Sequence, residues 1–121
     1  IEELQPRLRL EELAMAAAKI LASRLPTRID LHTTGFSATL TRRKETVVPA
    51  FDVPVQRATG AGDSWNAGNI LGDACEVSDV CRLALANAAA AYYISSPSGD
   101  HASREQLARF CGKLKVKKTA G

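Results

Sequence analysis

Residues 58–68 read ATGAGDSWNAG, and this stretch decides how the rest of the chain is interpreted. Gly60, Ala61 and Gly62 leave their backbone amides uncovered by bulky side chains, and a helical pattern begins directly afterwards. Amides that point from a loop into the first turn of a helix form, with the helix dipole, a pocket for negative charge. The stretch therefore predicts an anion-binding loop that opens a helix over about residues 63–73.

Asp63 stands at the mouth of this predicted pocket, where a carboxylate repels a bound phosphate. Its place is explained if it accepts the proton of a hydroxyl group that attacks the phosphorus. The structural alternative is an aspartate that caps the helix after a flexible turn. The P-loop pattern is excluded because the loop has no lysine, and the dinucleotide pattern fails at its third glycine, where Trp65 stands.

The pattern of the remaining chain predicts one α/β domain over residues 1–121, because a helix, several strands and further helices follow one another. Residues 29–33 alternate as in a strand, and further short strands follow, with a turn at residues 42–45. The second half is helical, with Ser78 as a predicted N-cap and Ser103 with Gln106 as a predicted capping box. An amphipathic first helix over about residues 10–24 is predicted by Leu10, Leu13, Ala14, Ala17, Ile20 and Leu21.

Composition narrows the class of protein. The net charge is +3, no apolar run approaches the length of a membrane span, and the three cysteines match no Cys-x-x-Cys spacing. We therefore expect a cytoplasmic protein that binds neither nucleic acid nor a membrane. A solvated helix end, rather than a nucleic-acid contact, is predicted for Lys113, Lys115, Lys117 and Lys118, since no aromatic residue interleaves them.

Three blocks of the sequence resemble the ribokinase-like (PfkB) carbohydrate kinases. The family's second signature, roughly D-T-x-G-A-G-D-x-F-x-x-G, is matched from Thr59 to Gly68, with Trp65 in place of phenylalanine. TTGFSATL, residues 33–40, resembles the family's T-x-G strand and turn, and ALANAAAAYYI, residues 84–94, resembles its Ala-Asn-Ala helix. The resemblance covers most of the chain, but only the C-terminal portion of such a kinase.

The resemblance implies the C-terminal part of a three-layer α/β/α sandwich that transfers the γ-phosphate of ATP, with Mg²⁺, to a sugar or nucleoside hydroxyl. It implies that Asp63 is the catalytic base and that Gly60, Ala61 and Gly62 form the anion hole. The substrate-binding N-terminal part would be missing from this chain, and a homodimer is compatible with the family.

The other two blocks imply nucleotide contacts. Thr33 and Gly35 match residues that line the nucleotide phosphates and ribose, and Asn87 matches an asparagine beside the adenine pocket. The alternatives are a strand-surface threonine and a helix asparagine that is satisfied by a neighbouring turn. Two histidines, His32 and His101, have no companion at metal-ligand spacing and are expected to be solvated or satisfied.

The sequence departs from the family just before the glycine loop. Arg57 and Ala58 stand where Asp-Thr is usual, and that aspartate helps to hold K⁺ in potassium-activated members. A guanidinium cannot ligate a cation but can occupy its electrostatic place, so we expect activity without K⁺, unless Arg57 is a surface residue. The magnesium motif of the family would fall at Glu2 or Glu3, between which the sequence does not decide.

Two further hypotheses stay open at this point. The first is a nucleotide-binding or regulatory module that has lost catalysis, which the departures at Arg57, Ala58 and Ala38 favour. The second is a self-contained fold in which the glycine loop is an ordinary turn. A severed half of a kinase should expose apolar surface where its partner layers belong, whereas a self-contained fold should not.

Overall fold

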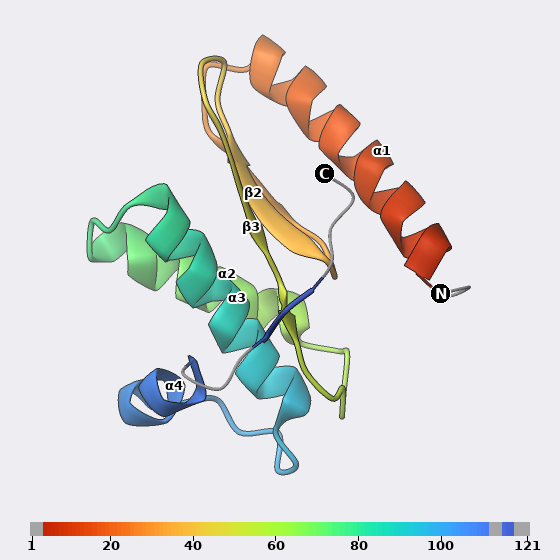
Figure 1. Cartoon of the computed structure of the whole chain (residues 1–121). Coiled ribbons are helices and arrows are strands. Elements are labelled where there is room, and N and C mark those ends of the chain that lie inside the picture. The colour runs from red at the N-terminus through yellow and green to blue at the C-terminus, as the bar shows by residue number, and fades with distance from the viewer. Residues whose placement is uncertain (1–3, 112–114, 118–121) are drawn as a thin grey trace.

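The computed structural model describes residues 4–111 and 115–117, and its elements follow the predicted order (Figure 1). The chain is a mixed α/β structure in which a small antiparallel sheet lies between helices. In chain order the elements are α1 (Leu4–Arg24), β1 (Ile29–His32), β2 (Phe36–Leu40), β3 (Glu45–Pro49), β4 (Phe51–Asp52), α2 (Ala61–Ala74), α3 (Asp79–Ser95), α4 (Arg104–Cys111) and β5 (Lys115–Val116).

The three-stranded sheet has the order β1-β2-β3, and both pairs are antiparallel. The predicted turn between β2 and β3 is confirmed: the hydroxyl of Thr41 accepts hydrogen bonds from the amides of Arg43 (3.3 Å) and Lys44 (3.1 Å). β4 and β5 form a separate antiparallel pair, which brings the C-terminal residues back beside Phe51.

The central strand, β2, is buried on both faces. Phe36, Ala38 and Leu40 form one core with Ala18 and Ala22 of α1. Because side chains alternate along a strand, Ser37 and Thr39 point to the opposite face, where they meet α2 and α3. The helix α1 therefore covers one face of the sheet, and the α2–α3 pair covers the other (Figure 1).

The first helix is confirmed but begins at Leu4, six residues earlier than predicted, with Pro6 in its first turn. A proline is tolerated there because the first amides of a helix have no intrahelical acceptor. Its predicted apolar stripe faces solvent, with Leu10 68% and Leu13 64% exposed. The sheet instead contacts the opposite side of α1, through its small alanines.

The predicted helix starts in the second half are confirmed. Ser78 caps α3 by accepting a hydrogen bond from the amide of Cys81 (3.3 Å). The capping box of α4 is present in both directions: the amide of Gln106 donates to Oγ of Ser103 (3.1 Å), and the amide of Ser103 donates to Oε1 of Gln106 (2.9 Å).

The helices α2 and α3 approach closely at glycine. A Cβ atom on Gly68 would lie 2.8 Å from the Cα of Ala86, so nothing larger than glycine fits without separating the helices. Ala86 and Ala89 of α3 complete this close contact.

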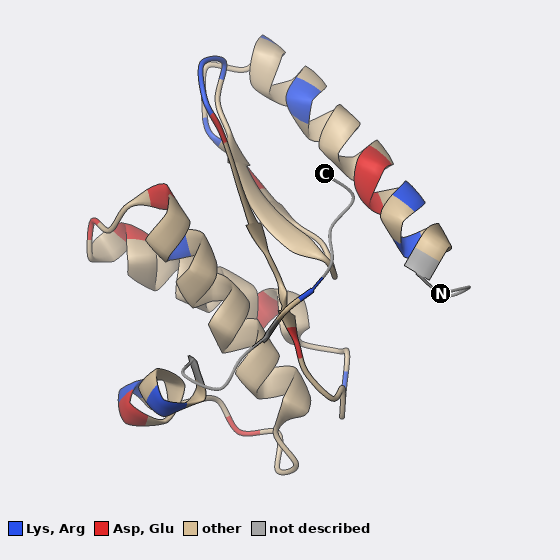
Figure 2. Cartoon of the chain, in the orientation of Figure 1, with Lys and Arg blue, Asp and Glu red and all other residues tan. Residues whose placement is uncertain are grey.

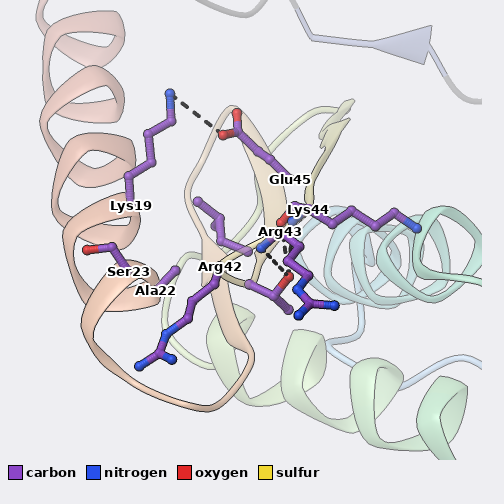
Figure 3. A pocket seen from close by; sticks show the side chains of 9 residues that line it. Lys19, Ala22, Ser23, Arg42, Arg43, Lys44 and Glu45 are labelled. Carbon is purple, nitrogen blue, oxygen red and sulfur yellow. Dashed lines mark hydrogen bonds and ion pairs between the residues drawn. The ribbon is translucent and has the colours of Figure 1, made fainter.

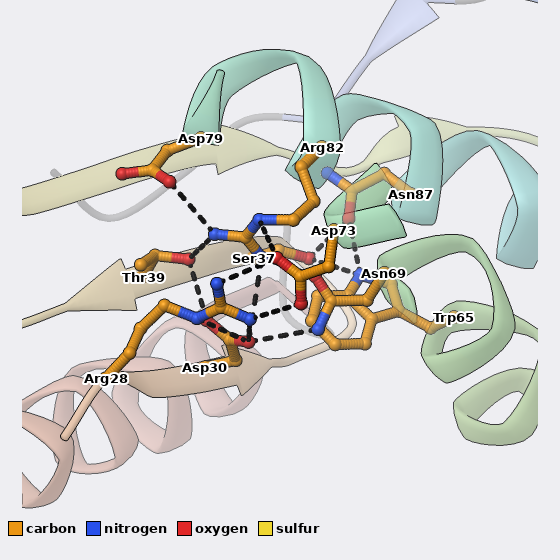
Figure 4. Close-up of polar contacts among 10 residues, drawn as sticks. All are labelled: Arg28, Asp30, Ser37, Thr39, Trp65, Asn69, Asp73, Asp79, Arg82 and Asn87. Atoms are coloured by element: carbon orange, nitrogen blue, oxygen red, sulfur yellow. Dashed lines mark hydrogen bonds and ion pairs between the residues drawn. The ribbon is translucent and has the colours of Figure 1, made fainter. Parts of the chain in front are cut away.

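A buried arginine joins the sheet to both helices of this layer (Figure 4). Arg82 is 1% exposed, and it donates hydrogen bonds to Oδ1 of Asn69 and to Oγ1 of Thr39 (2.7 Å). Its guanidinium also lies 3.6 Å from a carboxylate oxygen of Asp30 and 3.3 Å from one of Asp79. A buried charge is tolerated only when it is paired and hydrogen-bonded in this way.

Charged residues are frequent along α1, at the β2–β3 turn and on α4, whereas most of the α2 and α3 ribbons is uncharged (Figure 2). None of the helices in the described residues combines the length and the apolar character that a membrane crossing requires.

Candidate functional site: the glycine loop and the cavity beside it

The glycine loop ends in a conformation that requires glycine. Gly60 has φ 95° and ψ −6°, in the left-handed region, and it is the N-cap residue of α2. The hydroxyl of Tyr93 lies against it, and a Cβ atom on Gly60 would be 2.8 Å from that oxygen. Both the backbone angle and the space beside it therefore exclude other residues at this position.

The loop presents several free amide groups. Among the described residues, the amides of Gly60, Gly62 and Asp63 have no hydrogen-bond acceptor, while the amide of Ala61 donates to the carbonyl of Ala58 at 3.2 Å. These donors lie at the positive end of the α2 dipole, where an anion is stabilised. The arrangement has the donors that an anion hole requires.

Asp63 lies in the first turn of α2 and is exposed. Its side chain makes no cap hydrogen bond, so the alternative of a capping aspartate is wrong. Its carboxylate has no hydrogen-bond or ion-pair partner in the part of the chain that the structure describes. It is consequently free to accept a proton from a molecule at the loop.

A cavity of about 410 Å³ opens beside the loop. It brings together Thr33, Ala61 and Asn87, one residue from each of the three sequence blocks, whereas Gly35 and Asp63 do not line it. Its walls are mainly apolar, and no aspartate or glutamate of the described chain belongs to them. The other lining residues are His32, Thr34, Ala50, Phe51, Val55, Arg57, Ala58, Ala90, Ala91, Ile94 and Lys117.

Asn87 is held by the protein itself (Figure 4). Its Oδ1 accepts hydrogen bonds from Ser37 and from Nε1 of Trp65 (2.9 Å), and its Nδ2 donates to the carbonyls of Val48 (3.3 Å) and Pro49 (3.1 Å). Asn87 thus fixes the cavity wall where α3 meets the sheet. Trp65 is 3% exposed and packs α2 into a second core with Leu83, Ala86 and Ala90 of α3 and with Val48 of β3.

Thr33 and Gly35 form the turn between β1 and β2. The hydroxyl of Thr33 accepts hydrogen bonds from the amides of Gly35 (3.2 Å) and Phe36 (3.0 Å). Gly35 is covered by α1, since a Cβ atom there would lie 1.6 Å from Oε1 of Glu11. Glu11 is 3% exposed, and its Oε2 has no hydrogen-bond partner among the described residues.

Arg57 is engaged with the end of α3 rather than lying free at the loop's edge. Its guanidinium donates to the carbonyls of Tyr93 (2.8 Å), Ser96 and Pro97 (3.4 Å), and it lies 5.5 Å from the centre of the Tyr93 ring. A cation at the last carbonyls of a helix is favoured by the helix dipole. Arg57 therefore provides a fixed positive charge beside the glycine loop.

The two histidines occupy different environments. His32 lines the cavity and stacks on Trp65, with ring centres 5.0 Å apart, and burial lowers its pKa to about 4. His101 is exposed, stacks on Tyr93, and has its Nδ1 3.4 Å from Oγ of Ser64. His101 therefore has a polar neighbour in Ser64, whereas His32 is held by ring stacking and has no hydrogen bond within the described residues.

Lys117 is a lining residue that the sequence pattern misassigned. The predicted solvated helix end is wrong here, since α4 ends at Cys111 and Lys117 directly follows β5. Its Nζ donates to the carbonyl of Thr34 (2.9 Å), and its backbone amide donates to the carbonyl of Ala50 (2.6 Å). Burial lowers the pKa of its ammonium group, an effect to which nearby Arg7 adds. Lys113, Lys118, Glu2 and Glu3 lie outside the described residues.

A second hollow, of about 290 Å³, lies between α1 and the β2–β3 turn (Figure 3). Its cationic side chains fan out from the turn instead of converging, and Lys19 pairs with Glu45 across its rim at 3.7 Å (Figure 3). It is lined by Lys19, Ala22, Ser23, Leu40, Thr41, Arg42, Arg43, Lys44 and Glu45. It has no glycine loop and is the weaker candidate.

No protein-family model, curated protein or solved structure matches the chain.

Proposed function

We propose that the chain is the C-terminal, nucleotide-binding part of a ribokinase-like kinase of three-layer α/β/α architecture. It would transfer the γ-phosphate of ATP to a hydroxyl group of a sugar or nucleoside. The observation that carries the proposal is the common cavity of Thr33, Ala61 and Asn87, which come from three separate blocks of the sequence.

The glycine loop supports the phosphoryl-transfer step. The acceptor hydroxyl oxygen would bond to the γ-phosphorus while its proton passes to Asp63, and the bond from phosphorus to the bridging oxygen would break to release ADP. The free amides of Gly60, Gly62 and Asp63 would hydrogen-bond the charge on the migrating group. A single preorganised donor of this kind is worth about 3–4 kcal/mol of barrier in other enzymes.

The cavity supports a nucleotide as donor. Its volume of about 410 Å³ falls within the range of small-molecule sites, roughly 300–1,000 Å³. Apolar walls such as Ile94, Phe51 and Ala90 suit the faces of a purine ring. Mg²⁺ would supply charge neutralisation on the phosphates when bound, and the described residues contain no group of three His, Cys, Asp or Glu side chains that could hold it.

The exposed stripe of α1 supports the idea that a further part completes the kinase. Leu10, Leu13, Ile20 and Leu21 are each between 48% and 68% exposed and form one continuous helix face. Contiguous exposed apolar faces commonly bind a partner layer. We propose that the substrate-binding part of the same protein covers this face; a second copy of the chain is the alternative.

Isothermal titration of the 121-residue chain with ATP tests the nucleotide site, and turnover of the longer protein with a panel of sugars and nucleosides tests the reaction. A kinase is expected to keep ATP binding in the Asp63→Asn variant and to lose nearly all turnover. Asp73→Asn serves as a matched control, since Asp73 lies at the other end of α2, where it pairs with Arg28.

The outcomes separate the hypotheses. ATP binding with no turnover in either form would identify a non-catalytic nucleotide-binding module. A chain that binds no ATP and remains a cooperative monomer would identify a self-contained fold, and the kinase proposal would be abandoned.

A further inference from the structure

Lys117 is a half-buried cation without a carboxylate partner. No aspartate or glutamate of the described chain lies within 4 Å of its Nζ, and its hydrogen bond to the Thr34 carbonyl uses one of three donors. Asp52 and Glu11 are near enough to favour its charged form, but neither forms an ion pair with it. A lysine in this setting has lost part of its hydration without gaining a counter-charge.

The described wall of the cavity that Lys117 lines contains cationic side chains and no carboxylate, so it suits an anion. Of the two cationic side chains in its wall, Arg57 donates to three backbone carbonyls, so its donors are largely used. His32 is neutral near pH 7 because burial lowers its pKa to about 4. Lys117 is consequently the cation of the described wall that keeps free donors.

The position of Lys117 depends on the return of the chain end. β5 pairs with β4, and the Lys117 amide donates to the Ala50 carbonyl, so the side chain is directed to the β1–β2 turn. That turn contains Thr33, the residue expected to lie near the nucleotide phosphates. An anionic group at this end of the cavity would meet both the ammonium group and the turn.

We propose that Lys117 binds the phosphate chain of the nucleotide where the cavity meets the β1–β2 turn. That the ligand is a nucleotide rests on the proposed function, whereas its negative charge is inferred from Lys117 itself. A phosphate oxygen would take the remaining ammonium donors of Lys117. The chain end would then act as a phosphate-positioning element of the site.

The test compares ATP, adenosine and inorganic tripolyphosphate by isothermal titration of the full 121-residue chain and two variants. Lys117→Gln keeps a donor for the Thr34 carbonyl but removes the charge, and Lys19→Gln removes an exposed charge outside the cavity. In the Lys117 variant, we expect the Kd for ATP and for tripolyphosphate to rise by about tenfold, the loss of one charge-assisted contact, while adenosine binding is unchanged. The Lys19 variant is expected to match the wild type.

Each alternative result has one meaning. Equal ATP and tripolyphosphate binding by the wild type and Lys117→Gln would overturn the inference and leave the proposed function standing. Tripolyphosphate binding that depends on Lys117, without binding of ATP or adenosine, would support the anion site and overturn the nucleotide proposal. An equal loss of affinity for ATP and adenosine would assign Lys117 a structural role only and overturn the inference.

Discussion

His32 should make the stability of the protein depend on pH between about 6.5 and 4. Burial lowers its pKa from 6.5 to about 4, so the unfolded chain binds a proton that the folded chain rejects. For a group with a lowered folded pKa, the stabilisation is complete above the unfolded pKa and is lost as pH falls through the window from 6.5 to 4.

The magnitude follows from these two values. The difference between a His32 pKa of 6.5 in the unfolded chain and one of about 4 in the folded chain corresponds to roughly 3.4 kcal/mol of folding stability. About 2 kcal/mol of this stability is lost by pH 5. Because His32 is only half-buried, solvent screening reduces this figure, and we expect about 1 kcal/mol between pH 7 and pH 5. Asp30 titrates below this window. Burial acts to raise its pKa, but hydrogen bonds from Asn69, Thr39 and Arg28 lower it by more.

The assay uses Trp65, the single tryptophan of the chain, which stacks on His32 at 5.0 Å. Urea unfolding at pH 7 and pH 5, followed by circular dichroism, gives the free energy of unfolding. Native Trp65 fluorescence reports the titration directly, since a protonated imidazole quenches an adjacent indole. His32→Phe keeps a ring in the stack without a proton, and His101→Gln is the control at the other histidine.

We expect the loss of stability between pH 7 and pH 5 to disappear in His32→Phe and to persist in His101→Gln. Quenching of Trp65 should begin only near pH 4 to 5. A fluorescence midpoint close to 6.5, or an unchanged pH dependence in His32→Phe, would refute the inference that burial keeps this imidazole neutral.

Three further predictions concern packing and the glycine loop. Arg82→Met should lower the free energy of unfolding by about 3 kcal/mol in urea titrations, because it leaves the carboxylate of Asp30 and the amide of Asn69 without their partner. An unchanged urea midpoint would show that this network makes no net contribution to stability. Gly68→Ala should cost about 1–3 kcal/mol, because its Cβ would meet the Ala86 backbone at 2.8 Å. The same substitution at Gly62, where nothing lies within 4 Å, should be neutral or stabilising, and equal effects at both sites would contradict this account of the helix contact. Turnover by the proposed kinase should not rise when KCl replaces NaCl at equal ionic strength, because Arg57 already donates to the carbonyls at the end of α3; a several-fold increase would reject this role.

The sequence predicted the order of the elements and the helix starts at Ser78 and Ser103, because capping residues and hydrophobic period act locally. It did not predict which side of α1 meets the sheet, since hydrophobic residues alone suggested Leu10 and Leu13, whereas the structure packs small alanines there. That choice depends on how close the helix can approach, which periodicity does not contain.

The site shows the same division between local and long-range information. The glycine loop and Asp63 are adjacent in sequence, so their arrangement could be predicted from a short stretch. Lys117 could not, because it reaches the cavity through a strand pairing with residues more than sixty positions earlier in the chain. A charge near a chain end gives no signal of burial until its pairing partner is known.

The two faces of β2 have a thermal consequence. Toward α1 the strand offers methyl and phenyl groups, whereas toward α2 and α3 it offers hydroxyl groups that accept hydrogen bonds from Trp65 and Arg82. Attraction between apolar surfaces weakens on cooling, and the contact of the strand with α1 rests on such surfaces. Chilling should accordingly loosen α1 first, and amide exchange near 0 °C should reveal a helix that detaches while the remainder stays closed.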